Sequence, residues 1–250
     1  MEANIVLKRR FGFEDITVSH VQQSNWQIDP KVRAQADALW QVKLVDYTAK
    51  GLKFWDGDFY RVENLQELRD SSEANKLNFE LGIVKYRYVN TVKDLYEYYE
   101  HHPESWPQHL AIGALLRTID NYWVFGVRGS GSVEVGTQDI IGGGMTATEL
   151  VVNDANGMRQ VLFKELHEEA GIKPEHVSTM QGIGIVCSPS AYIIILVETK
   201  LNVSRKQLAE IFLGKEDDEM ADLVFIKDAE VRDYLKTLPG FRPLVAELLD

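Results

Sequence analysis

The sequence predicts a layered α/β fold, in which helices cover a sheet of strands. Short apolar segments typical of strands alternate with longer segments whose apolar residues recur at helical spacing, and this interleaving favours a layered arrangement. The chain has 250 residues, 45% of them hydrophobic, which is enough for one large core or two small ones. No repeat or low-complexity tract interrupts the pattern.

The N-terminal part is predicted to mix strands and helices. Asp29-Pro30 favours a helix start, because aspartate caps a helix and proline fits its first turn, and we expect this helix to reach Leu44. A second helix is expected from Thr91 to Glu100. Short runs rich in apolar, β-branched and aromatic residues predict strands at 5–7, 15–18, 54–62 and 77–89.

The segment from His101 to Pro107 contains two prolines and is predicted to be a linker. A linker at this place would separate two units of different length. We therefore expect a mixed α/β region over residues 1–105 and a second domain over residues 106–250.

The second domain is predicted to start with a hairpin whose turn is Asp120-Asn121, a pair that favours tight turns. A glycine run follows at Gly142–Gly144, and then an acidic helix at Gly157–Ala170. The strands expected in this domain lie at 110–116, 122–127, 182–186, 192–198 and 223–226, and the further helices at 204–213 and 228–238.

The helix predicted at Gly157–Ala170 has clear end signals. Asn153 or Asp154 can cap its start, and Gly171 can take the left-handed conformation that ends many helices. Its last turns hold three acids at i, i+3 and i+4, a spacing that brings them to one side of the helix. These acids are Glu165, Glu168 and Glu169.

The orientation of these acids points to a bound cation. At about 100° per residue, Glu165 and Glu169 face the same side as the apolar residues of the helix, whereas Gln160, Lys164 and His167 face the opposite side. The acids repel each other and lie at the negative end of the helix dipole, which disfavours an anion by about 0.3–1 kcal/mol. Three hard oxygen donors favour Mg²⁺, or Mn²⁺, over Zn²⁺. The alternative interpretation is an acidic helix end that pairs with nearby lysine or arginine.

Two segments of the sequence together resemble the Nudix box. The first, Ile140–Glu149, is a β-rich run that breaks into glycines and reaches an acid. Within it, Gly143 and Glu149 have the spacing of the opening glycine and glutamate of the box. The second segment, Lys164–Ile172, matches the second half of the box position by position. The matching residues are Glu165, Leu166, Glu168, Glu169, Gly171 and Ile172.

Two departures separate the chain from the family pattern. Fourteen residues lie between Glu149 and Lys164, where the family usually has seven, so residues 150–157 are expected to form an enlarged loop. Lys164 stands where the family has arginine, and an ammonium cannot reproduce the two-pronged contact of a guanidinium with a carboxylate. The resemblance gives Gly143, Glu149, Lys164 and Gly171 structural roles and leaves the metal-binding half of the box intact.

The resemblance implies a Nudix-type α/β/α sandwich with a mixed sheet, preceded by the small N-terminal region. It also implies a hydrolase that cleaves a diphosphate linkage, with Mg²⁺ bridging the phosphate oxygens and acidifying the attacking water. Glu165, Glu168 and Glu169 match the metal ligands and catalytic residues of the family. Of these, Glu165 is a candidate both to bind the metal and to orient or deprotonate the water. The backbone carbonyl of Gly142 is a weaker candidate ligand.

Three further residues are candidates on weaker grounds. Arg128 follows a predicted strand on the approach to the glycines and can pair with a phosphate, and Arg117 is a second candidate for this role. Glu219 stands in a late acidic loop, from which many Nudix enzymes draw an assisting acid, so it is a candidate base. A solvated arginine and a solvated charge run are the alternative interpretations of Arg128 and Glu219.

The substrate is predicted from a looser resemblance. The N-terminal region, the segment Phe54–Arg61 and the enlarged loop are similar to Nudix enzymes that act on UDP-sugars, which implies cleavage of UDP-glucose or a relative to UMP and a sugar 1-phosphate. ADP-ribose or another nucleotide diphosphate is the competing substrate, and a Nudix-like domain that senses a nucleotide or mediates assembly without turnover is the alternative of another class. The aromatic residues of the N-terminal region are expected to form its core rather than to stack a base. They are Trp40, Phe54, Trp55, Tyr60 and Trp106.

Charge and composition limit the partners and the location. A net charge of −11 argues against a broad nucleic-acid or anionic-membrane surface, so we expect a small nucleoside diphosphate derivative as the ligand. The single cysteine, Cys187, excludes an internal disulfide framework, suits a reducing compartment and is expected to be a buried apolar residue. The chain shows neither a signal-peptide stretch nor an apolar run long enough to span a bilayer, and it is predicted to be cytoplasmic. A homodimer is compatible with the sequence.

Overall fold

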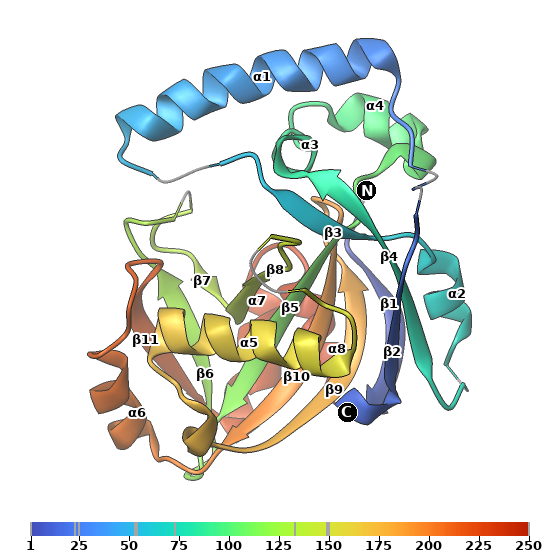
Figure 1. Ribbon diagram of the computed structural model, residues 1–250. Helices are drawn as coiled ribbons and strands as arrows, with labels where there is room; N and C mark the ends of the chain where they lie inside the picture. The colour runs from blue at the N-terminus through green and yellow to red at the C-terminus, as the bar shows by residue number, and fades with distance from the viewer. Residues whose placement is uncertain are drawn as a thin grey trace.

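The computed structural model describes residues 2–22, 24, 26–52, 55–72, 74–132, 134–148 and 151–249. Within these residues, the strands form one mixed sheet that curls through the molecule (Figure 1). The strands are β1 (Asn4–Phe11), β2 (Ile16–His20), β3 (Asp58–Val62), β4 (Leu77–Lys85), β5 (His109–Arg117), β6 (Tyr122–Arg128), β7 (Gln138–Asp139), β8 (Ile141–Gly144), β9 (Val177–Cys187), β10 (Tyr192–Leu201) and β11 (Met220–Lys227). The helices are α1 (Pro30–Ala49), α2 (Leu65–Asp70), α3 (Tyr86–Asn90), α4 (Tyr96–His101), α5 (Ala155–Ala170), α6 (Arg205–Phe212), α7 (Val231–Thr237) and α8 (Arg242–Leu248).

β5 is the strand that organises the sheet, whose main order is β1-β9-β10-β5-β3-β4-β2. β10 pairs in parallel with β5 along the whole length of β5. The antiparallel partners of β5 divide it between them, because β8 pairs with Ala111–Ala114 and β6 with Leu116 and Arg117. β6 pairs in turn with β11. The glycine run of β8 therefore lies against the first half of β5.

Helices cover both faces of this sheet. α5 packs on one face, where Leu162 joins a core that contains Ile112 of β5. α7 and α8 cover the opposite face, where Leu235 and Val245 pack with Leu115 of β5 (Figure 1). Alternate residues of β5 thus reach the two cores, as the period of a strand requires. The predicted α/β sandwich with a mixed sheet is confirmed.

The N-terminal region builds a third core beneath α1. Val32 and Ala36 of α1 pack with Val89 of α3, Tyr99 of α4 and Trp106. α1 begins at Pro30, as predicted, with the Asp29 side chain accepting a hydrogen bond in its first turn, and it continues beyond the predicted end. The long blue helix at the top of Figure 1 is this element.

Two expectations for the N-terminal region are wrong in detail. Residues 86–90, predicted as the end of a strand, form α3, because Tyr88 and Val89 pack into the third core and tertiary packing overrides the strand propensity of these residue types. The helix predicted from Thr91 is confined to α4, which starts at Tyr96. The sequence gives no prediction of α2 or α8, since such short helices carry a weak periodic signal.

The segment 101–107, predicted to be a linker, includes a packed residue. Trp106 is 1% exposed and donates its indole N–H to the Tyr99 carbonyl oxygen at 2.6 Å. Strands from both sides of the segment belong to one sheet, because β1 pairs with β9 and β3 meets β5. The division into residues 1–105 and 106–250 stays a prediction.

The N-terminal aromatic residues mostly serve the core, as predicted. Trp40, Tyr60 and Trp106 are buried, whereas Trp55 is 47% exposed. Phe54 lies outside the described residues. Core packing is therefore confirmed for three of these five side chains.

Cys187 is buried, in agreement with its expected role as a small apolar residue. Burial raises the pKa of its thiol to about 11, so the thiol is protonated at neutral pH. Among the described helices, none combines the length and apolar character needed to cross a membrane.

Candidate active site

The acidic helix α5 has the ends that its sequence predicts. The Asp154 carboxylate accepts a hydrogen bond from the Gly157 N–H at 2.8 Å, which decides between the two candidate capping residues. Gly171 ends the helix with a φ of 68°, in the left-handed conformation that glycine adopts without strain. These ends place the three acids in the final turns.

Each glycine of β8 makes room for a different neighbour. A Cβ atom at Gly142, whose φ is 153°, would lie 2.2 Å from a backbone carbonyl oxygen of β5. A Cβ at Gly143 would lie 2.5 Å from the Glu165 carboxylate, and one at Gly144 would lie 2.3 Å from the His109 ring. The glycine run thus lets β8 approach β5, the acidic helix and a buried histidine together.

Glu169 is the most buried acid of α5, with 2% of its surface exposed. Its carboxylate accepts a hydrogen bond from the Gly142 N–H at 3.1 Å. Burial raises the pKa of Glu169 well above its ordinary value, and the negative charges of Glu165 and Glu219 raise it further. Arg128 and the Gly142 N–H act in the opposite direction and offset these effects only in part. Glu169 therefore stands where negative charge is in excess.

The loop that carries Glu219 is tied to α5 and to the segment after β6. The backbone N–H groups of residues 216–217 donate to the carbonyl oxygen of Glu168, at 3.1 and 3.2 Å. The N–H of Gly129 donates to the carbonyl oxygen of Glu219 at 2.6 Å. These bonds explain how an acid from a late loop comes near enough to raise the pKa of Glu169.

Glu168 is directed toward Lys164. Its carboxylate accepts a hydrogen bond from the Lys164 Nζ at 2.9 Å, and its side chain is 33% exposed. Lys164, which replaces the arginine of the family pattern, therefore pairs within its own helix. Glu149, the other partner considered for Lys164, lies outside the described residues. Of the three acids, only Glu165 and Glu169 are placed against β8.

Arg128 brings positive charge to these acids. Its Nη1 lies 3.9 Å from the Glu219 carboxylate, and its Nη2 donates to Asp139 at 3.1 Å. Burial lowers the pKa of Arg128, but the charges of Asp139, Glu169 and Glu219 outweigh burial and raise the pKa overall. The structure thus joins three residues that lie far apart in the sequence, Arg128, Glu169 and Glu219.

Arg128, Glu165, Glu169 and Glu219, with the residues that hold them, are called the cluster below. Sequence reasoning missed two of the residues that hold it, Asp139 and Arg242. Asp139 is 6% exposed and receives hydrogen bonds from the guanidinium groups of both Arg128 and Arg242. The available signal for Asp139 is a charged residue directly before the apolar pair Ile140-Ile141. No sequence signal relates Arg242 to it, because the two positions lie 103 residues apart.

Arg117 does not join the cluster. It lies near the turn between β5 and β6, where its guanidinium contacts Asp228 at 3.1 Å and Asn121 at 3.2 Å. It pairs with Trp123 near the start of β6, whereas Arg128 ends that strand, and five residues of strand span about 17 Å. The geometry therefore offers no support for the predicted binding role of Arg117.

His109 is buried behind the glycine run, with 1% of its surface exposed. Its ring packs against Phe59 and Tyr192, at centroid distances of 4.6 and 4.9 Å. Neither ring nitrogen has a hydrogen-bond partner among the described residues, and burial lowers the pKa of His109 to about 3. The imidazole is therefore neutral at neutral pH.

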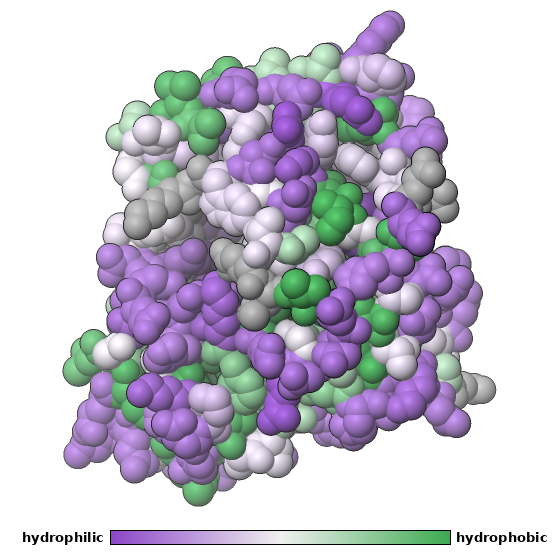
Figure 2. Space-filling model, viewed as in Figure 1, coloured by the Kyte–Doolittle hydropathy of each residue, from purple (hydrophilic) through white to green (hydrophobic). Residues whose placement is uncertain are grey.

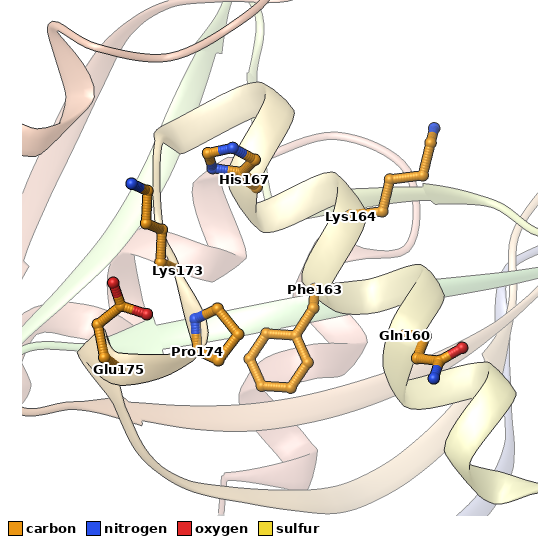
Figure 3. A pocket seen from close by; sticks show the side chains of 7 residues that line it. All are labelled: Gln160, Phe163, Lys164, His167, Lys173, Pro174 and Glu175. Atoms are coloured by element: carbon orange, nitrogen blue, oxygen red, sulfur yellow. The ribbon is translucent and has the colours of Figure 1, made fainter.

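A shallow hollow of about 650 Å³ lies on the outer face of α5 (Figure 3). Three of the side chains that line it, Gln160, Lys164 and His167, are those predicted from helical spacing to face away from the apolar side. That orientation is confirmed, and the hollow is separate from the acids that lie against β8. On the face of the molecule seen in Figure 1, hydrophilic residues dominate the surface, with hydrophobic patches scattered between them (Figure 2).

The cluster fits a divalent cation by its chemistry, although its side chains are not gathered as ligands. Among the residues that the structure describes, no group of three or more His, Cys, Asp or Glu side chains stands ready to hold a metal ion. Glu165 and Glu169 nevertheless offer hard oxygen donors, and their shared negative charge is only partly offset by Arg128. A cation held by these carboxylates would offset the repulsion from Glu165, which adds to the effect of burial on the pKa of Glu169.

Similarity to known proteins is found among solved structures. No model of a protein family and no curated protein matches the chain. Among solved structures, DR0079 from Deinococcus radiodurans is 14% identical with a TM-score of 0.42, covering 57% of this chain and 83% of that chain. The NUDIX domain of Shewanella oneidensis NrtR, complexed with ADP ribose, is 15% identical with a TM-score of 0.39, covering 61% and 95%. RenU, a Nudix hydrolase from M. smegmatis, is 18% identical with a TM-score of 0.37, covering 57% and 82%.

Proposed function

We propose that this protein is a Nudix-type hydrolase that uses a divalent metal ion to cleave the diphosphate linkage of a nucleoside diphosphate joined to another moiety. The observation that carries the proposal is the burial of Glu169 beside Glu165 and Glu219. The acids of a solvated helix face would spread into water, whereas Glu169 is held at the glycine run by the Gly142 N–H. A buried acid in a repulsive environment is typical of functional sites.

Glu165 and Glu169 are the proposed metal ligands. A Mg²⁺ or Mn²⁺ ion bound there would neutralise phosphate oxygens and lower the pKa of the attacking water. Glu168 is proposed as a further ligand, which requires its carboxylate to leave Lys164. The Gly142 carbonyl oxygen remains a weaker candidate, while the N–H of the same residue orients Glu169.

Arg128 and Glu219 are the proposed partners of substrate and water. Arg128 carries a permanent charge on a planar fork that matches phosphate geometry, and it lies beside the acids. The side chain of Glu219 is 50% exposed, so water can reach its carboxylate. We assign Arg128 to a phosphate of the substrate and Glu219 to the proton of the attacking water.

UDP-glucose is the proposed substrate, on the sequence resemblance to enzymes that act on UDP-sugars. Attack of water on one phosphorus atom would break its bond to the bridging oxygen and give UMP and glucose 1-phosphate. ADP-ribose, the ligand named for the Shewanella domain, is the second candidate.

The test is a product screen. UDP-glucose, other UDP-sugars, ADP-ribose, dinucleoside polyphosphates and nucleoside triphosphates are incubated with the protein and Mg²⁺ or Mn²⁺, and products are identified by mass. We expect UMP and glucose 1-phosphate, and Glu169→Gln to lower kcat by about a hundredfold or more, the scale of losing a group that stabilises transition-state charge. Glu175→Gln is the matched control, because Glu175 is an exposed acid in the turn after α5 that lines the outer hollow, and this variant should keep full activity.

Two results would contradict the proposal. The first is a fully active Glu169→Gln protein. The second is nucleotide-induced stabilisation with no product from any candidate in excess metal, which would instead support a domain that senses a nucleotide without turnover.

A further inference from the structure

Asp139 holds two guanidinium groups with one buried carboxylate. Arg128 donates to its Oδ2 through Nε at 3.3 Å and through Nη2 at 3.1 Å. Arg242 donates to its Oδ1 through Nε at 3.0 Å, and the Nη2 of Arg242 contacts Oδ2. The Oδ1 atom also accepts the Ile140 N–H at 2.9 Å. The carboxylate is therefore saturated with donors.

The charges of this group do not cancel. Two arginines face one aspartate, and the side chains of Asp139 and Arg242 are only 8% and 12% exposed. A buried carboxylate shared between two cations neutralises each of them in part. Arg128 is the more exposed arginine, at 23%, and lies on the side of Glu169 and Glu219. Because Arg242 shares Asp139, less of the positive charge of Arg128 is offset by that carboxylate.

Arg242 is fixed independently of this pair. Its Nη1 donates to the Pro239 carbonyl oxygen at 3.2 Å, and its guanidinium lies 4.8 Å from the centre of the Phe241 ring. Arg242 starts α8, which packs on the face of the sheet opposite α5. Helix α8 therefore positions the Arg242 guanidinium on the side of Asp139 away from the acids of α5.

We infer that Arg242 is a positioning residue for phosphate binding, which acts through Asp139 on Arg128. Arg242 offsets part of the negative charge of Asp139. Asp139 can therefore orient the Nε and Nη2 edge of Arg128 without cancelling the positive charge of Arg128. The Nη1 group of Arg128 lies 3.9 Å from the Glu219 carboxylate and donates to the Ser132 hydroxyl at 3.5 Å. This edge of the guanidinium does not contact Asp139, and we assign it to a phosphate oxygen of the substrate, which would replace the long bond to Ser132. The inference rests on the proposed function, because it assigns Arg128 to that phosphate.

A double-mutant cycle separates this role from a merely structural one. The dissociation constants of UDP and of ADP are measured by calorimetry for the wild type, Arg128→Met, Arg242→Met and the double variant. Residues that act through one another give non-additive effects. We expect Arg242→Met to weaken binding of the preferred nucleotide about tenfold in the wild-type background and less than about twofold when Arg128 is already methionine.

Two further variants complete the design. Arg242→Lys keeps the charge, so it should restore part of the affinity and serves as the measured variant if Arg242→Met fails to fold. Arg232→Met is the matched control, because Arg232 lies on α7 and donates to the Leu249 carbonyl oxygen at 2.8 Å. It should bind nucleotide as the wild type does.

The outcomes distinguish the inference from the proposed function. Additive effects of Arg128→Met and Arg242→Met, or no effect of Arg242→Met, overturn the inference even if the protein hydrolyses UDP-glucose. A non-additive cycle without any hydrolysis supports the inference and rejects the proposed catalysis. A wild type that binds neither UDP nor ADP overturns both.

Discussion

Glu165, Glu168 and Glu169 have different environments although they lie within five consecutive residues. Glu169 is buried and accepts a hydrogen bond from the Gly142 N–H. Glu165 lies against Gly143, and Glu168 pairs with Lys164. Helical spacing predicts the inward direction of two of these acids, since direction depends only on the period of the helix. Helical spacing cannot predict whether Glu168 joins Glu165 and Glu169 or pairs with Lys164, because both arrangements are compatible with its position on the helix.

His109 gives a stability prediction at the scale of one residue. Its pKa falls from 6.5 to about 3 on folding, so the unfolded chain binds more protons between these pH values and stability decreases as pH falls below 6.5. The contribution changes by up to about 1.4 kcal/mol per pH unit. Urea unfolding at pH 7, 6 and 5 should show this slope in the wild type and a shallower slope in His109→Gln.

The comparison of slopes controls for any general loss of stability in the variant. Equal slopes for the two proteins would mean that His109 is charged in the folded state or exposed, in contradiction to its burial.

β8 shows what can be predicted for an element and what cannot. The capped acidic helix is placed as its sequence signals predict, whereas the glycines, expected to break a β-rich run, themselves form most of strand β8. The strand predicted across residues 86–90 fails because tyrosine and valine favour strands locally, whereas packing beneath α1 selects a helix. Local patterns therefore predict the elements beside the site better than those of the N-terminal region.

Alanine should have different effects at two neighbouring positions of β8, lowering folding stability at Gly142 and turnover at Gly143. Gly142→Ala would place a Cβ against the backbone of β5 at a positive φ, so we expect a loss of about 2–4 kcal/mol of folding stability. In Gly143→Ala, the atoms nearest to the new Cβ belong to the end of the Glu165 side chain, which can move. It should fold within about 1 kcal/mol of the wild type but turn over substrate about tenfold more slowly.

Urea unfolding and steady-state kinetics on both variants check this contrast. A Gly143→Ala protein with wild-type turnover would show that the position of Glu165 does not matter. A Gly142→Ala protein of wild-type stability would contradict the close approach of β8 to β5.

At the scale of the whole molecule, the site is assembled from distant parts of the chain. Asp139 meets Arg242 across 103 residues, and the late loop with Glu219 is bonded to α5 and to Gly129. Such contacts depend on how the sheet brings its strands together, and no local pattern encodes them. The acids of the motif and Arg128 could therefore be predicted from the sequence, whereas Asp139 and Arg242, which hold Arg128, could not.

The central claim is that Glu165 and Glu169 hold a divalent ion, and titration calorimetry with Mn²⁺ tests it most directly. We expect the wild type and the Glu175→Gln control to bind Mn²⁺ alike, and Glu165→Gln and Glu169→Gln to bind at least about tenfold more weakly, since each loses a charged oxygen donor. Unchanged Mn²⁺ affinity in both of these variants, with their fold intact, would contradict the claim.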